Sequence, residues 1–176
     1  MSLADRRVTA KKEEEQKNKI ADGEYSVRLK DWKFGKSKGG KDMYTLTWKI
    51  LKKLNPGKKE DATADKGKER RTFYLPSYNW SIVALLDLIE GMGANLEAME
   101  EYSEIDDVME EVEDTKMPKA TMALEHEEGK QHPNIEIKDI EKVLKPKKEE
   151  KKKASTKKPV DDDDDDDDDD DVAVPD

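Results

Sequence analysis

The sequence contains no cysteine, which excludes disulfides, thiolate metal sites and cysteine nucleophiles and gives no reason to expect an oxidising compartment. Long hydrophobic runs are missing too. The longest apolar stretch covers residues 82–86, whereas a membrane span needs about 20 such residues. The charged N-terminal residues contain no signal-peptide core. These absences predict a soluble cytoplasmic protein with no membrane partner.

Hydrophobic residues are scarce, at 33% of 176 residues, while charged residues make up 44%. The charge is uneven, because residues 160–176 hold 12 aspartates and no basic residue, whereas residues 1–159 carry 34 basic and 32 acidic side chains. This composition predicts one modest domain diluted by charged segments that cannot fold. We expect the following organisation: a flexible charged arm or short helix over residues 1–20, a domain over 21–145, a Lys-rich linker over 146–160 and a disordered poly-Asp tail over 161–176.

Alternating apolar and polar residues predict a β-hairpin at the start of the domain. Tyr25, Val27 and Leu29 form the apolar face of a first strand. The same alternation places four other residues together on the opposite face: Arg28, Lys30, Trp32 and Phe34. A glycine-rich turn over residues 35–41 leads to a second strand over residues 43–50.

Further strands are expected over residues 70–75, 119–127 and 134–143. Between the third and fourth strands, residues 80–90 predict a mostly buried helix, and residues 95–114 predict one or two acidic amphipathic helical turns. Five short strands with a helix between the third and fourth are the element order of an OB-fold. We therefore predict a mainly β protein, a five-stranded Greek-key barrel.

Basic and acidic residues occupy different halves of the domain. Residues 1–80 carry 21 basic and 12 acidic side chains, whereas residues 81–145 carry 6 and 18. A basic groove binds phosphates, and aromatic side chains beside it stack on bases without sequence preference. The pattern predicts single-stranded nucleic acid as the ligand. The candidate ssDNA-binding residues lie on the first strand, in its turn and on the next two strands: Arg28, Lys30, Trp32, Phe34, Lys36, Lys38, Lys41, Lys49, Arg70 and Tyr74.

The aromatic candidates have an alternative interpretation, which is packing. Trp32 and Phe34 could fold back over a barrel mouth, and Trp48 belongs with the apolar core face of the second strand. The exposure of Tyr74 depends only on its alternation with Phe73, which we expect to face the core.

No catalytic motif is present. Gly35-Lys36-Ser37 has the end of a phosphate-binding loop but lacks the required glycine five positions before Gly35. Two histidines without cysteine are too few to indicate a metal site. We therefore predict a binding protein that is not an enzyme and uses no cofactor or metal.

Several stretches resemble a phage family of OB-fold single-stranded DNA-binding proteins, first catalogued as a domain of unknown function. The similar stretches are residues 22–27 (DGEYSV), the turn over 35–40, the strand over 43–50 with its Trp48, and residues 137–139 (IKD). The resemblance covers roughly residues 20–145. It implies sequence-independent ssDNA binding in DNA replication, recombination or repair.

Eleven consecutive aspartates, residues 161–171, resemble the acidic tails of phage and bacterial single-stranded DNA-binding proteins, although this chain ends in VAVPD and not in their usual aromatic residue. The resemblance implies a tail that competes with DNA and docks replication or recombination proteins. Representative tail positions are Asp161, Asp165, Asp171 and Asp176. Flexible tethering over about 15 residues gives an effective concentration of millimolar order at the basic face.

Other functions are compatible with the same sequence. The aspartate run could make the chain a histone-chaperone-like protein or a polyanion mimic, with the barrel as a mount. An RNA-binding barrel would use the same stacking and phosphate contacts. An edge strand or the acidic helix could also pair with a second copy to form a homodimer.

Overall fold

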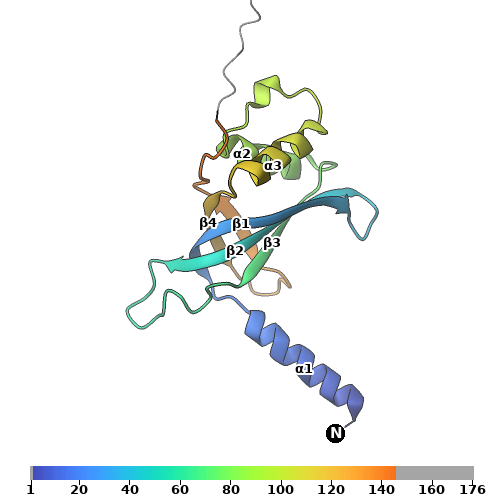
Figure 1. Cartoon of the computed structure of the whole chain (residues 1–176). Coiled ribbons are helices and arrows are strands. Elements are labelled where there is room, and N and C mark those ends of the chain that lie inside the picture. Colours follow the sequence, from blue (N-terminus) through green and yellow to red (C-terminus); the bar gives the residue numbers. More distant parts are fainter. Residues whose placement is uncertain (1, 146–176) are drawn as a thin grey trace, which may run out of the picture. The chain divides into compact units, whose positions relative to one another are not determined.

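The computed structural model describes residues 2–145. Its elements run in this order (Figure 1): α1 (Leu3–Asn18), β1 (Gly23–Lys36), β2 (Asp42–Leu54), β3 (Glu69–Tyr74), α2 (Asn79–Gly91), the 3-10 helix η1 (Leu96–Ala98), α3 (Glu104–Thr115), β4 (Lys119–Glu125) and β5 (Asn134–Lys138). The mainly β class, the five strands and the helix between the third and fourth strands are confirmed. Within residues 2–145, no helix has the length and apolar character that a bilayer span requires.

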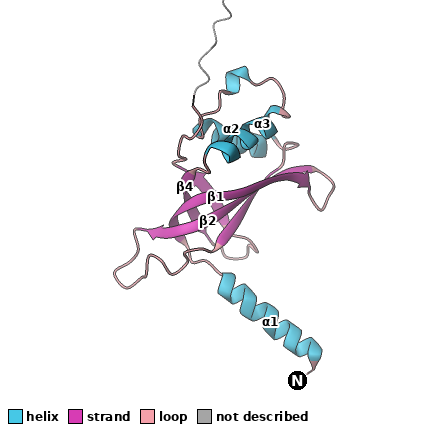
Figure 2. Ribbon diagram, in the orientation of Figure 1, coloured by secondary structure: helices cyan, strands magenta, loops and turns pink. Residues whose placement is uncertain are grey.

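All five strands form one antiparallel sheet in the order β3-β2-β1-β4-β5, so β3 and β5 are its edges. The expected hairpins, β1 with β2 and β4 with β5, are both present. The connection from β3 to β4 contains α2 and α3 and brings the chain back beside β1. In Figure 2 the two helices lie together on one side of the sheet.

A β-bulge divides β1 into two halves. Leu29 lies opposite Trp48 of β2, but the next pair joins Asp31 to Thr47, so Lys30 has no partner. An unpaired extra residue shifts the alternation by one position, and every later side chain changes face. β1 therefore presents its odd-numbered residues to the core before the bulge and its even-numbered residues after it.

This bulge corrects one of the sequence predictions. Trp32 lies opposite Leu46, and Phe34 lies opposite Tyr44 with a ring-centroid distance of 4.8 Å. Leu46 and Tyr44 belong to the buried core. The expectation that Trp32 and Phe34 share a face with the basic residues of β1 is therefore wrong.

The core fills the space between the inner face of the sheet and the two long helices of the β3–β4 connection. The buried residues of α3 are Ile105, Met109 and Val112, whose spacing places them on one helix face. Two hydrogen bonds attach the same helix to the sheet: Tyr44 Oη donates to Asp106 Oδ1 (2.7 Å) and Trp32 Nε1 donates to Glu113 Oε2 (3.1 Å). The expected acidic amphipathic helix is confirmed, and its inner edge helps to hold the sheet.

The faces of β3 are the reverse of the prediction. Tyr74 lies opposite Tyr44 and is only 9% exposed, whereas Phe73 lies opposite Thr45 and is 52% exposed. A register difference of one residue exchanges the two faces of a strand. The expectation that Tyr74 is exposed and Phe73 faces the core is therefore wrong, and Phe73 takes the exposed position.

Trp48 provides a test of core packing. It is fully buried, and its Nε1 donates to the buried Thr72 Oγ1 at 3.0 Å. We expect Thr72→Val to lower the free energy of unfolding by about 1–3 kcal/mol, because it leaves the indole N–H without an acceptor. Urea unfolding measures the loss. Thr45→Val, on the outer face of β2, is the matched control and should change stability by less than about 0.5 kcal/mol; equal effects would contradict the assignment.

Candidate nucleic-acid interface

Three basic side chains lie side by side on the outer face of the sheet. Arg28 of β1 is directly opposite both Lys49 of β2 and Lys119 of β4. All three residues are exposed, and none forms an ion pair with another residue of the described range 2–145. Like charges directly opposite one another destabilise a sheet. This cation row therefore indicates an anionic ligand.

A cleft adjoins the cation row. Four of the eight residues that line it are basic: Arg28, Lys30, Lys49 and Lys66. The cleft lies between two bulges, because the register of β2 also shifts, between the pairs Ser26–Lys52 and Val27–Ile50, and leaves Leu51 as an extra residue in the cleft wall. Bulges redirect side chains and are common beside functional sites.

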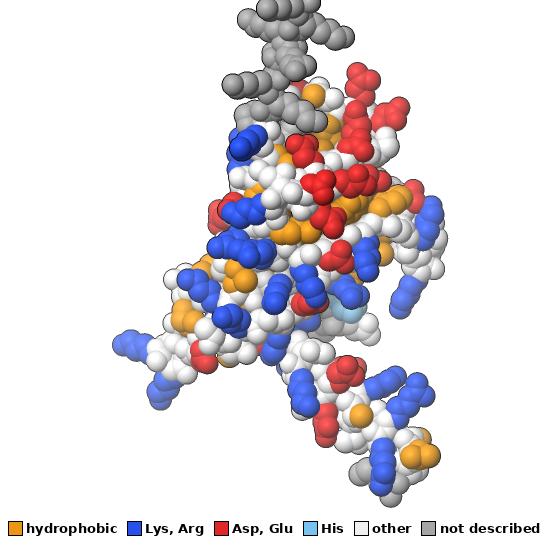
Figure 3. Space-filling model, in the orientation of Figure 1, with side chains coloured by type: hydrophobic (Ala, Val, Ile, Leu, Met, Phe, Trp, Pro, Cys, Tyr) orange, Lys and Arg blue, Asp and Glu red, His pale blue; other side chains and the backbone are white. Residues whose placement is uncertain are grey.

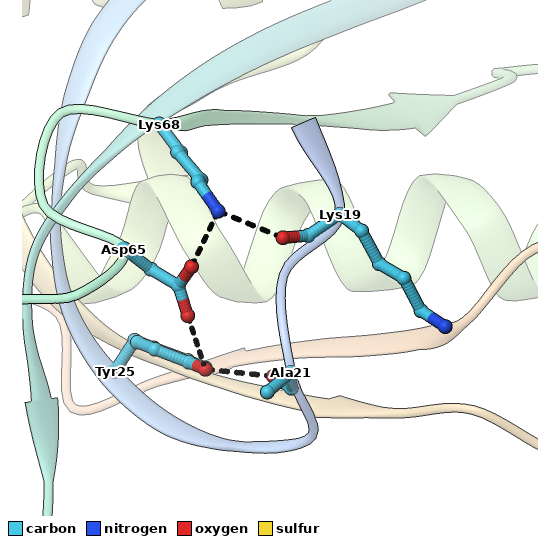
Figure 4. A network of polar contacts seen from close by, with 5 residues as sticks. All are labelled: Lys19, Ala21, Tyr25, Asp65 and Lys68. Atoms are coloured by element: carbon cyan, nitrogen blue, oxygen red, sulfur yellow. Dashed lines mark hydrogen bonds and ion pairs between the residues drawn. The ribbon is translucent and has the colours of Figure 1, made fainter. Parts of the chain in front are cut away.

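The loop that carries Lys66 is attached to the start of β1 by a polar network (Figure 4). Lys68 Nζ donates to Asp65 Oδ1 (2.7 Å) and to the backbone oxygen of Lys19 (2.8 Å). The hydroxyl of Tyr25 lies 3.1 Å from Asp65 Oδ2 and 2.7 Å from the backbone oxygen of Ala21. The carboxylate of Asp65 thus joins the loop to the strand.

The network shifts the pKa values of the Asp65 carboxyl and the Tyr25 hydroxyl. Partial burial acts to raise the pKa of Asp65, but the hydrogen bonds from Lys68 and Tyr25 outweigh it, so the pKa lies below its ordinary value. Burial, together with the neighbouring Asp65 carboxylate, raises the pKa of the Tyr25 hydroxyl well above its ordinary value. At neutral pH Asp65 is therefore charged and Tyr25 is neutral, which is the pairing that the geometry requires.

The outer face continues along the strands as two further rows. One contains Asp31 and Arg71 on either side of Thr47, and the next contains Lys33 and Phe73 on either side of Thr45. The negative charge of Asp31 is partly balanced by Lys33, whose Nζ lies 3.8 Å away. This face therefore combines cations with one exposed aromatic ring.

Only part of the predicted site is brought together. Arg28, Lys30 and Lys49 share the basic cleft, although Lys30 is ion-paired with Glu69. Arg70 lies opposite Trp48 on the inner side of β3, so it is not part of this face. The three predicted aromatic contacts are not part of it either: Trp32, Phe34 and Tyr74.

The predicted lysines of the β1–β2 turn lie apart from the cleft. Lys36 is ion-paired with Asp42. Lys38 is exposed in the turn. Lys41 Nζ donates to Tyr78 Oη (2.6 Å) and lies 4.3 Å from the centroid of its ring.

The sequence interpretation missed four residues of this face. They are Lys66, Arg71, Phe73 and Lys119. Lys119 becomes a site residue only because β4 pairs with β1, a contact that no local pattern predicts. In β3, Arg71 alternates with Thr72 and Phe73 with Tyr74, so each face carries one aromatic residue. The alternation alone therefore does not show which face is buried.

Charge is segregated over the surface as well as along the chain. Residues 72–115 contain 12 acidic residues and no lysine or arginine. In Figure 3 the acidic side chains gather over the helical side, whereas basic side chains gather over the sheet and its loops. Within residues 2–145, no group of three metal-ligating side chains is present. The tail positions Asp161, Asp165, Asp171 and Asp176 lie outside the described residues.

The sequence matches no known family model and no curated protein.

Asp65 gives the loop a pH-dependent attachment. Because its folded-state pKa is lowered, its stabilising contribution is complete above the ordinary pKa and is lost as pH falls through the folded-state value. We expect Asp65→Asn to lower the unfolding free energy by about 1–3 kcal/mol at pH 7. Unfolding titrations at pH 7 and pH 3 measure the difference between variant and native chain, which should shrink at pH 3. A difference that is the same at both pH values would contradict this role. Asp61→Asn is the control for the contact with β1, because the pKa of Asp61 is also lowered, but by hydrogen bonds from Thr63 within the same loop; its effect on unfolding should be smaller at pH 7.

Proposed function

We propose that the protein binds single-stranded DNA without sequence preference and acts in DNA replication, recombination or repair. The observation that carries this proposal is the row of three cations, Arg28, Lys49 and Lys119, beside a basic cleft; none of the three has an ion-pair partner among residues 2–145. Glu69 lies opposite Lys49 at one end of the row, and Glu141 is near Lys119 at the other. The adjacent cations still repel one another, and a phosphate backbone would neutralise them and release counterions.

The strand order of the sheet agrees with this proposal. We propose that the sheet is an OB-fold, because its strand order is that of an unrolled OB-fold barrel and its helices follow the third strand. Residues of both edge strands, β3 and β5, line one groove, as expected for a sheet that curls toward closure. Membership of the phage ssDNA-binding family is part of this proposal.

The exposed aromatic ring of the outer face favours single-stranded over double-stranded nucleic acid. Phe73 is half exposed beside Arg71 and Lys33, and an aromatic ring among cations can stack on an unpaired base. The bases of a duplex are stacked on one another and not available to such a ring. Competition between oligo-dT and oligo-rU of equal length distinguishes a preference for DNA from a preference for RNA.

The salt dependence of binding tests the cation row. We expect Arg28→Ala, Lys49→Ala and Lys119→Ala each to weaken binding of labelled oligo-dT and to reduce the slope of log K against log salt by about 0.7, the value for one phosphate contact on a single strand. Fluorescence anisotropy at several salt concentrations measures both. The unfolding free energy should stay constant or rise, because each change relieves repulsion.

Lys142→Ala is the matched control, since it removes one exposed lysine that lies outside the cation row and the cleft. Its slope should equal that of the native chain. If the native chain fails to bind oligo-dT, or binds duplex more tightly, the proposed function is wrong. The histone-chaperone-like or polyanion-mimic function would then be the next to test.

We also propose that the acidic tail competes with DNA for this face and, when displaced, docks replication or recombination proteins. Deleting residues 160–176 should raise the affinity for oligo-dT at low salt, and the gain should shrink at high salt, which screens both contacts. The anisotropy titration measures this gain. An unchanged affinity would show that the tail does not compete.

A further inference from the structure

We infer that the bound strand has a second contact site at the β3 edge, where nucleobases stack on Trp80 and Phe73. This inference rests on the proposed function and extends it to residues outside the basic cleft. The site lies in a groove lined by α1, β3, α2, β5 and the loop before β5, with both basic and acidic side chains in its walls. It is separate from the cleft at the two bulges, with which it shares only Gly67.

Two exposed aromatic side chains line this groove. Trp80, in the first turn of α2, is 72% exposed, and Phe73 is 52% exposed. Both rings line the same groove. Large aromatic side chains dominate binding energetics when a partner covers them, and two exposed rings in one groove indicate a ligand with flat apolar faces.

A second aromatic ring, that of Tyr78, packs against Trp80. The indole of Trp80 stacks on this ring, with centroids 6.2 Å apart and an interplanar angle of 23°. Tyr78 is itself fixed by Lys41, whose ammonium lies 4.3 Å from the ring centroid and donates to the hydroxyl at 2.6 Å. No other aromatic ring contacts Trp80 within residues 2–145. The indole is therefore held from one side, so that little freedom is lost when a base stacks on it.

The groove also contains the cations that a nucleotide needs. Arg70 and Arg71 of β3 line it beside Phe73. Arg71 is exposed and forms no ion pair with another described residue. Within residues 2–145, Arg70 Nε is the one buried side-chain nitrogen or oxygen that lacks a hydrogen-bond partner. Rings and guanidinium groups together favour nucleotides over an apolar peptide.

The two sites are connected through β3. Arg71 and Phe73 belong to the outer face by their register with Thr47 and Thr45, and they also line the groove. A strand that follows the outer face from the cation row reaches these two residues before it reaches Trp80. Asp87, two turns further along α2, also lines the groove and repels phosphates, which limits how far the strand extends.

Tryptophan fluorescence tests this path in the full chain. Of the three tryptophans, Trp48 is fully buried and Trp32 is partly buried against the core, so Trp80 is the one that a base can cover. We expect oligo-dT to quench native fluorescence and this quenching to be lost in Trp80→Phe, which still binds. Trp80→Ala should bind long oligo-dT about 5- to 150-fold more weakly, the range of one lost stacking contact.

Tyr102→Ala is the matched control, because Tyr102 is 56% exposed and does not line the groove. Its affinity should equal that of the native chain. If Trp80→Ala binds as tightly as the native chain while Arg28→Ala binds more weakly, the second site is refuted and the proposed function stands. If the native chain does not bind oligo-dT, both are refuted. Circular dichroism checks that each variant is folded.

Discussion

The bulge at Lys30 is the constraint on which the rest of the sheet depends. β1 pairs with β2 along nearly its whole length but with β4 only as far as Arg28, and the bulge follows directly where that second pairing ends. A central strand of uniform alternation would present Trp32 to solvent. Because the bulge changes the face, Trp32 instead contacts the core and donates to Glu113 of α3.

The same irregularity shapes the outer face. The bulges at Lys30 and Leu51 lie on neighbouring strands, and the basic cleft lies between them. One side of the bulged region therefore supports the helical layer, while the other side exposes cations. Core packing and the candidate site are coupled through β1, so a change of register that repaired the alternation of the strand would disturb both. The attachment of the Lys66 loop through Asp65 completes the cleft wall from a third segment.

The sequence predicted the order of helices and strands along the chain, both hairpins and the buried face of the first half of β1. Period-two alternation and turn residues are local signals. The sequence placed Trp32, Phe34 and Tyr74 on the wrong faces of their strands, because the face of each residue depends on the register. A bulge leaves no mark in an alternating sequence, and β3 has an aromatic residue on each face. The cation row depends on long-range pairing of β1 with β4. Composition could predict a basic half, but only topology could place Lys119 on the outer face and Arg70 on the inner side of β3.

Charge segregation restricts where a polyanion can bind. Over residues 72–115 the chain offers no basic side chain, so a phosphate backbone that approaches the acidic surface of α3 is repelled within a Debye length of about 8–10 Å. In the proposed function, the outer face attracts the same backbone. Trp80 lies at the start of α2, before the first acidic residue of that helix, Asp87. Attraction at the cation row and repulsion along the helices therefore define both ends of one path. In the proposed function, stacking then holds unpaired bases along this path without sequence preference, because every base presents a flat aromatic face.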